Sequence, residues 1–202
     1  RKISLAAVIT GIIFCFYYII QLWIVLERAP MRTLGETRLW YAFFMAAVGI
    51  IIYLLWKMKW MVYYSILLST VFLTINLLHP ENFDKSLMPA LQSVWFVPHV
   101  IVYMFSYALL GASMLMALKA LWLRFNNQPN NELCHRTDNV VYLGYAFLTF
   151  GLLFGALWAK EAWGHYWTWD PKETWAFITW LMYLLYIHFR YHYRKSTTAA
   201  MW

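Results

Sequence analysis

The sequence has little charge and almost no cysteine, and both shortages exclude whole classes of protein. Only 12% of its 202 residues are charged and 63% are hydrophobic, whereas a soluble domain carries about 25% charged residues. A soluble globular domain is therefore excluded. The two cysteines, Cys15 and Cys134, lie far apart, which excludes a disulfide framework, a CxxC redox pair and a four-cysteine metal site. No CxxCH motif is present, so the chain is not itself a c-type cytochrome.

Acidic residues are also scarce, which leaves a formal net charge of +7. A nucleic-acid-binding module would gather its basic residues on one polar face. Here the lysines and arginines occupy short gaps between long apolar runs. We therefore expect membrane lipid, and not nucleic acid, around this chain.

Charge-free apolar runs predict six transmembrane helices, because a membrane-spanning helix needs about 20 mostly apolar residues. The expected spans are 3–26, 39–56, 60–78, 86–118, 139–159 and 174–189. The first run is too long for the apolar core of a signal peptide, so it is predicted to be a retained span. The predicted fold class is an all-α bundle of about six transmembrane helices, forming a single integral membrane domain over residues 1–202.

The fourth run is longer than a bilayer requires. Its first part, 86–93 with Pro89, is predicted to be an external interfacial segment that leads into a helix from about Val94. Pro98 then falls in the opening turns of that helix, where a missing N–H is tolerated.

The distribution of basic residues predicts the orientation of the spans, because cytoplasmic loops carry the excess of lysine and arginine. With the amino terminus inside, ten basic residues fall on the inner side and six on the outer side. Both termini of this chain are therefore expected in the cytoplasm.

The third external connection, about 158–175, has a tryptophan density that an interfacial belt does not explain. Six tryptophans fall within 23 residues, whereas a belt needs one or two rings at each helix end. They are Trp158, Trp163, Trp167, Trp169, Trp175 and Trp180. Large planar rings stack on planar apolar ligands, and a porphyrin is such a ligand.

A helix start follows directly after the tryptophans. Asp170 suits the N-cap, Pro171 suits the first helical position, and Glu173 completes a capping-box pattern. Asp170 therefore has a predicted structural role whatever the loop binds.

The loop resembles the WWD signature of the haem-handling proteins of cytochrome c maturation. Residues 163–175 read WGHYWTWDPKETW, and Ile178-Thr179-Trp180 follow. Within that superfamily the run is most similar to the CcsA (ResC) component of the system II cytochrome c synthase, because the related CcmC and CcmF branches diverge after the aspartate. The similarity extends to 93–111, which includes Trp95 and His99, and more loosely to 30–40.

This resemblance implies that haem b is the ligand. The implied haem-contacting residues of the loop are Trp163, Gly164, Tyr166, Trp167, Trp169 and Asp170. His99, near the outer end of the fourth span, is the implied axial ligand of the external haem iron. His188 lies 13 residues after Trp175, hence about 20 Å deeper in the membrane, and is the implied ligand of haem on its entry route from the cytoplasm. No catalytic residue is predicted.

The remaining histidines and external basic residues carry weaker expectations. His192 is expected at the inner interface, His165 on the surface and His79 at a helix terminus, and His135 carries no hypothesis. The basic residues that would either pair with the haem propionates or simply be solvated are Lys172, Arg28, Arg32 and Arg38.

One departure from the family concerns the second axial ligand. CcsA proteins generally continue into further spans and carry another external histidine after the loop, whereas this sequence stops at Met201 and Trp202. The chain is therefore interpreted as a fragment that lacks later spans. Otherwise the second ligand comes from His79, His165 or a partner.

The expected function is that of a haem-channelling and haem-presenting subunit of a cytochrome c haem-lyase (synthase). The resemblance implies a CcsB-type membrane subunit and apocytochrome c as partners, in the bacterial cytoplasmic membrane or the thylakoid. The alternative is a CcmC-like haem carrier without ligase activity, and a structural subunit with a heavy aromatic belt is a third possibility.

Overall fold

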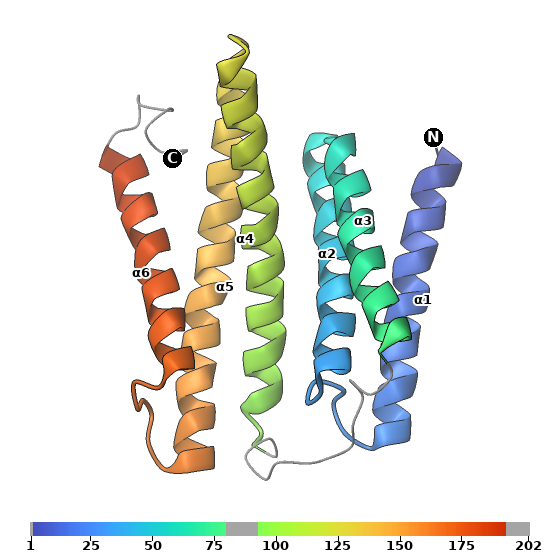
Figure 1. The fold of residues 1–202 in the computed structure, drawn as a ribbon, viewed down its shortest axis with the longest axis vertical. Coiled ribbons are helices and arrows are strands. Elements are labelled where there is room, and N and C mark those ends of the chain that lie inside the picture. Colours follow the sequence, from blue (N-terminus) through green and yellow to red (C-terminus); the bar gives the residue numbers. More distant parts are fainter. Residues whose placement is uncertain (1, 80–92, 193–202) are drawn as a thin grey trace. The chain divides into compact units, whose positions relative to one another are not determined.

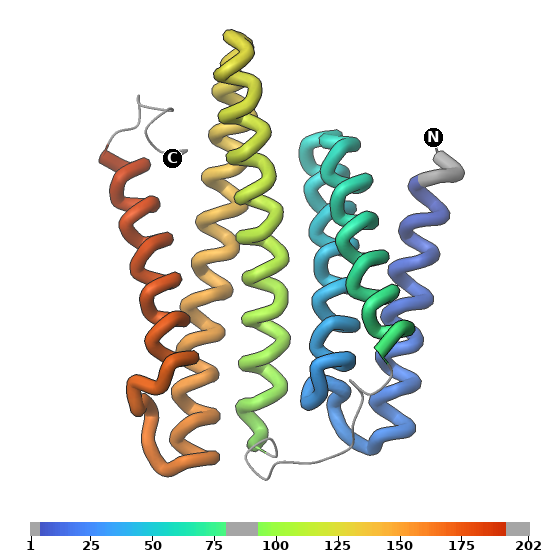
Figure 2. The backbone as a smooth tube through the Cα atoms, in the orientation of Figure 1, coloured from blue at the N-terminus to red at the C-terminus, as the bar shows by residue number. Residues whose placement is uncertain are grey.

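The computed structural model describes residues 2–79 and 93–192, which form six α-helices (Figure 1). In chain order they are α1 (Lys2–Leu26), α2 (Leu34–Trp56), α3 (Lys59–Leu78), α4 (Phe96–Phe125), α5 (Asn131–Trp163) and α6 (Pro171–His192). The predicted all-α class is confirmed, and Figure 2 traces these helices as a tube. Five of the described helices, α1 to α5, are long and apolar enough to cross a membrane, so this is an integral membrane protein.

The helix α6 forms where the sequence predicts it but is less apolar than the other five. Lys172 and Glu173 lie in its first turn, and Arg190 lies in its last. These charges leave an uncharged run, 174–189, that is shorter than the roughly 20 residues a span usually needs. That α6 crosses the membrane stays a prediction.

The helices α4 and α5 differ from the expected spans at their starts. α4 begins at Phe96, slightly later than expected, with Pro98 in its first turn as predicted. α5 begins well before residue 139, because the side chain of Asn130 caps it and accepts a hydrogen bond from the Leu133 N–H at 2.9 Å. Polar residues thus extend the helix beyond its charge-free run.

The described residues belong to two compact units, one within 1–92 and one within 93–202, and each is described by itself. The single domain expected for 1–202 stays a prediction. Residues 80–92 and 193–202 lie outside the described residues, and with them the expectations for Pro89 and for the chain end at Met201 and Trp202.

In the first unit, α2 and α3 pack closely through small and polar side chains. A Cβ added at Gly49 would lie 1.9 Å from Ser65 Oγ, so only glycine allows this approach. Ser69 Oγ and Asn76 Nδ2 each donate a hydrogen bond to a backbone carbonyl of α2, at 2.7 and 2.8 Å. Small residues and interhelical hydrogen bonds are the usual means of helix association in membranes.

In the second unit, glycines on α5 bring it against α4. A Cβ at Gly144 would lie 2.7 Å from the Leu110 side chain, and one at Gly151 would lie 2.3 Å from the Tyr103 ring. Ser106 Oγ donates a hydrogen bond to the Gly144 carbonyl at 2.8 Å. The close packing of α4 and α5 therefore depends on positions that carry no side chain.

The helix α6 is attached to α5 by polar contacts. The Trp180 indole N–H donates to Thr149 Oγ1 at 2.9 Å, and the Tyr186 hydroxyl donates to Asp138 Oδ1 at 2.6 Å. Arg190 forms a buried ion pair with Asp138. These contacts place α6 beside α5 along much of its length.

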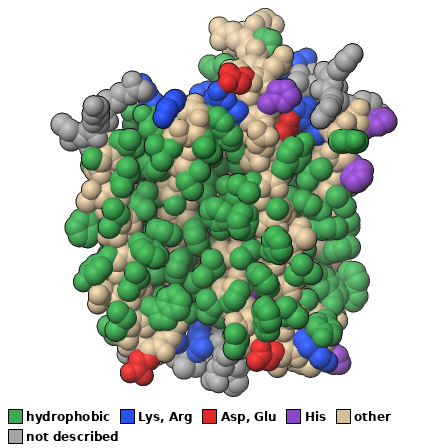
Figure 3. All heavy atoms as spheres, turned by 180° about the vertical axis from the view of Figure 1, so that it is seen from behind, with side chains coloured by type: hydrophobic (Ala, Val, Ile, Leu, Met, Phe, Trp, Pro, Cys, Tyr) green, Lys and Arg blue, Asp and Glu red, His purple; other side chains and the backbone are tan. Residues whose placement is uncertain are grey.

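Figure 3 shows hydrophobic side chains along the helices, with charged side chains gathered near helix ends. This distribution is what a hydrocarbon layer requires, because a charge at its centre is costly. The predicted orientation, with both termini in the cytoplasm, stays a prediction.

Candidate functional site: an aromatic cavity between α4, α5 and α6

The tryptophan-rich loop begins and ends with defined local structure. Gly164 ends α5 in the left-handed conformation, with a φ of 84°, and its N–H bonds to the Lys160 carbonyl at 3.0 Å. Glycine suits this position because a side chain would be strained there. Trp169, just before the next helix, also has a positive φ, of 60°.

The predicted helix start is confirmed in atomic detail. Asp170 Oδ1 accepts the Glu173 N–H at 2.8 Å, and Glu173 Oε2 accepts the Asp170 N–H at 3.4 Å. Glu173 Oε2 also accepts the Thr168 N–H at 2.7 Å. The capping box therefore anchors the loop as well as the helix.

A cavity of about 310 Å³ opens between the start of α4, the end of α5, this loop and the start of α6. Its volume lies in the range of small-molecule sites, roughly 300–1,000 Å³. Five predicted site residues line it: His99, Trp163, Tyr166, Trp167 and Asp170. His99, which lies 64 or more positions before the other four residues in the sequence, thus meets them at one site.

His99 is half-buried and held on several sides. Its Nδ1 atom lies 2.8 Å from the Gly151 carbonyl oxygen, and because a carbonyl only accepts, Nδ1 carries the proton. The ring stacks on Trp158 at 5.6 Å between centroids and meets the edge of Tyr103 at 4.9 Å. In this tautomer Nε2 keeps its lone pair, as an iron ligand requires.

The loop tryptophans fall into two ring clusters. Trp163 packs edge-on against Trp158 at 4.8 Å, on the His99 side of the cavity. Trp167 packs against Trp169 at 5.7 Å and against Phe177 at 6.2 Å. The rings are thus fixed by each other and by the start of α6.

Three predicted site residues lie away from the cavity wall. Trp169 is 64% exposed, and Gly164 shapes the loop rather than lining the cavity. His188 lies near the other end of α6 and is exposed. His99 and His188 therefore do not share a site, in keeping with the separate depths predicted for them.

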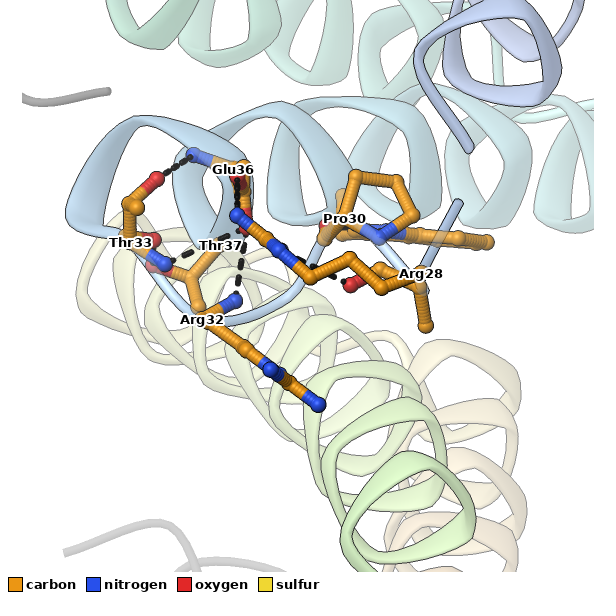
Figure 4. A network of polar contacts seen from close by, with 8 residues as sticks. Arg28, Pro30, Arg32, Thr33, Glu36 and Thr37 are labelled. Carbon is orange, nitrogen blue, oxygen red and sulfur yellow. Dashed lines mark hydrogen bonds and ion pairs between the residues drawn. The ribbon is translucent and has the colours of Figure 1, made fainter. Parts of the chain in front are cut away.

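The candidate propionate partners belong to different units. Lys172 lines the cavity and is exposed. In the first unit, Figure 4 shows Arg28 turned toward Glu36, to which it donates two hydrogen bonds at 2.9 and 3.0 Å. Arg28 is therefore engaged within the unit.

Arg32 enters the Figure 4 network through its backbone N–H, which bonds to Glu36 Oε2 at 2.7 Å. Burial and the charge of Arg28 lower the pKa of its guanidinium, and Glu36 acts in the opposite direction. The nearby Trp40 indole N–H donates to the Pro30 carbonyl at 2.9 Å. The segment 30–40, to which the resemblance extends more loosely, thus builds the turn between α1 and α2.

The histidines with weaker expectations lie outside the cavity wall. His79 ends α3, with its N–H bonded to the Ile75 carbonyl at 3.0 Å, as expected of a helix-terminus residue. His165 is exposed on the loop, and His135 and His192 are exposed at the other end of the unit.

The residues that hold the His99 ring in place were not predicted from the sequence. Tyr103 and Trp158 contact the ring, and the Gly151 carbonyl and Gly155 of α5 face it. A signal for the glycines was present, because Gly144, Gly151 and Gly155 recur on one face of a helix.

The residues present fit a planar, iron-containing ligand. The cavity has aromatic walls, and His99 supplies one nitrogen lone pair. The Trp167 indole N–H is buried and has no hydrogen-bond partner among the described residues. Buried donors in proteins are normally satisfied, so a ligand that brings an acceptor would complete this wall.

The fold and the site define a polytopic helical membrane protein with an aromatic, histidine-containing cavity at one end of its helices. The pattern of the family described as "Cytochrome C assembly protein" matches residues 57–202. The chain belongs to this family.

Relatives named "Cytochrome c biogenesis protein CcsA" support the assignment. The protein from Cuscuta reflexa is 33% identical over 89% of this chain and 70% of its own length. The protein from Chlamydomonas reinhardtii is 43% identical over 61% of this chain and 37% of its own length. The one from Prochlorococcus marinus is 38% identical over 61% of this chain and 50% of its own length. The chain thus spans between about a third and two thirds of these relatives.

Proposed function

We propose that this chain binds haem b at its outer surface and presents it, within a cytochrome c synthase, to the CxxCH segment of an apocytochrome. One observation carries the proposal: the His99 imidazole lines the same cavity as Trp163, Tyr166 and Trp167. An imidazole with a free lone pair beside flat rings suits a macrocycle that needs both an axial ligand and stacking surfaces.

The residues of the cavity have distinct roles in this proposal. His99 Nε2 would ligate the iron, and the ring of Trp163 would cover the macrocycle and exclude water. Trp158 would hold the His99 ring on which it stacks. Lys172, exposed at the cavity rim, pairs with a propionate. Asp170 keeps its capping role, because its carboxylate is already bonded to the helix N-terminus.

The chemistry needs positioning and not an acid-base residue. Each cysteine S–H of the apocytochrome adds across a haem vinyl double bond: an S–C bond forms, and the hydrogen ends on the adjacent carbon. This addition is redox-neutral, so the chain's contribution is to hold the vinyl edge toward the incoming thiols and to keep water away.

The route by which haem arrives is the second part of the proposal. Haem enters from the cytoplasmic side at a site that includes His188 and moves outward to the His99 cavity. His188 lies exposed on α6, so further protein, such as a CcsB-type subunit, would complete its surroundings. The membrane would be the bacterial cytoplasmic membrane or the thylakoid.

A co-expression experiment tests the function. The full-length protein and its partner subunit are produced with an apocytochrome in a host that lacks its own maturation genes, and covalent haem is stained after denaturation. We expect covalently attached haem in the apocytochrome. Haem that stays bound to the membrane protein and is never transferred would instead favour the carrier function, and purification without any haem absorbance would favour a structural subunit.

The ligand assignment is tested separately with His99→Gly. We expect this variant to retain less haem after purification, and added imidazole to restore part of the loss by occupying the vacated space. An absorption spectrum identical to that of the unchanged protein would refute His99 as the ligand.

A further inference from the structure

The helix α5 has a notch opposite His99, formed by the missing side chain of Gly155 beside the backbone carbonyl of Gly151. The Gly151 carbonyl oxygen lies 2.8 Å from His99 Nδ1. A Cβ added at Gly155 would lie 2.8 Å from Cε1 and 2.9 Å from Nδ1 of the same ring. The two glycines are one turn apart on one helix face, so any side chain at the second would displace the imidazole from the first.

The Gly151 carbonyl in this notch can accept a second hydrogen bond, from His99. In an α-helix the carbonyl of residue i accepts the N–H of residue i+4, so the Gly151 carbonyl already accepts one hydrogen bond within the helix. A carbonyl oxygen has a second lone pair, which remains for an outside donor. The missing side chain at Gly155 gives the imidazole access to it.

Aromatic contacts fix the remaining freedom of the ring. Trp158 stacks on the His99 ring with only 20° between the planes, and Tyr103 meets it at 60°. Together with the hydrogen bond, these contacts determine both the tilt of the ring and the nitrogen that carries the proton.

We propose that the α5 notch, Gly151 and Gly155, is a positioning device that selects His99 Nε2 as the iron ligand and lowers the reduction potential of the bound iron. The inference rests on the proposed function, in which His99 ligates haem. A metal-bound histidine that donates its other N–H to a carbonyl is held in one tautomer and becomes a more basic ligand. A more basic axial ligand favours the ferric form of the iron, and axial ligation is one of the means by which proteins tune haem.

The first experiment tests the hydrogen bond by chemical rescue. The full-length His99→Gly protein, with its partner subunit, is titrated with imidazole and with 1-methylimidazole. Bound haem and its midpoint potential are then measured. Both molecules have a nitrogen lone pair, but only imidazole has an N–H for the Gly151 carbonyl.

We expect 1-methylimidazole to require a concentration about tenfold higher, the low end of the cost of removing the hydrogen-bond partner of a metal-bound histidine, and to give a higher midpoint potential. Equal rescue with equal potentials would overturn the inference.

The second experiment tests the notch itself with Gly155→Ala and a matched control. Gly144→Ala creates a comparable overlap on the same helix, with Leu110 at 2.7 Å, and lies away from His99. We expect Gly155→Ala to lose haem and to raise the potential of what remains, while Gly144→Ala keeps the haem spectrum and the potential.

The outcomes separate this inference from the proposed function. If the two alanine variants change haem binding and potential equally, the cause is a general separation of α4 and α5. That result would overturn the positioning role of the notch. An unchanged Gly155→Ala protein would do the same and leave His99 as the ligand. An unchanged His99→Gly protein would remove the proposed ligand itself.

Discussion

Trp163 and Trp175 belong to the same signature but have different surroundings. Trp163 lines the cavity and packs against Trp158. Trp175 lies on α6, outside the cavity wall, and is 68% exposed. A signature in a sequence does not separate a ring that lines a cavity from a ring that faces lipid or solvent, because both are tryptophan.

We predict that Trp163→Leu weakens haem retention about fivefold, corresponding to an aromatic contact of about 1 kcal/mol. The measurement is bound haem per protein after graded detergent washes. Trp175→Leu is the matched control and should retain haem like the unchanged protein. If the two variants lose haem equally, the cavity is not the haem site.

At the residue scale, the sequence identified side chains with distinctive chemistry and missed the positions that hold them. His99 and the loop tryptophans were singled out because an ionisable residue in a predicted span and a loop rich in indoles are both unusual, and the family resemblance implied their roles. Gly155 was not predicted. The role of a glycine in an apolar helix depends on which neighbouring side chain fills the space left by its missing Cβ, and the sequence does not identify that neighbour.

At the element scale, α6 is tied to α5 by a buried polar cluster. Asp138 accepts hydrogen bonds from the Tyr186 hydroxyl and from Arg190. The ion-pair side chains are only 8% and 4% exposed. Removing one charge from such a pair leaves the other buried and uncompensated.

We predict that Arg190→Ala lowers the free energy of unfolding by about 3–5 kcal/mol, measured by SDS-induced unfolding in mixed micelles. The double variant Asp138→Asn/Arg190→Leu removes both charges and keeps an acceptor for Tyr186, so it should recover most of the loss. An Arg190→Ala protein as stable as the unchanged one would show that the pair does not hold α6.

Element boundaries were predictable where local chemistry sets them. The start of α6 followed from Asp170, Pro171 and Glu173, and their hydrogen bonds confirm it. The start of α5 was missed, because the charge-free run marks the apolar part of a helix, whereas the Asn130 cap lies beyond that part.

At the scale of the whole molecule, the excess of basic residues predicts which loops face the cytoplasm. His165 lies in the tryptophan loop and His135 near the start of α5, and both are exposed in the structure. These two positions therefore report opposite sides of the membrane without disturbing the cavity wall.

We predict that His165→Cys, made with Cys15 and Cys134 replaced by serine, reacts with a membrane-impermeant maleimide in intact cells. His135→Cys should react only after the membrane is permeabilised. The measurement is the mass shift of the labelled protein, and the reverse pattern would contradict the predicted orientation.

The sequence by itself determined the membrane environment, the helical class and the concentration of tryptophans in a loop that ends at a capped helix, because these follow from composition, apolar length and local capping. Only the tertiary structure decided that the His99 ring rests on α5 and that five of the predicted residues share one cavity. The reason is that α4, α5 and the loop are distant in sequence. Their meeting depends on the close approach of two helix backbones, and a row of glycines on one helix face does not specify which helix packs against it.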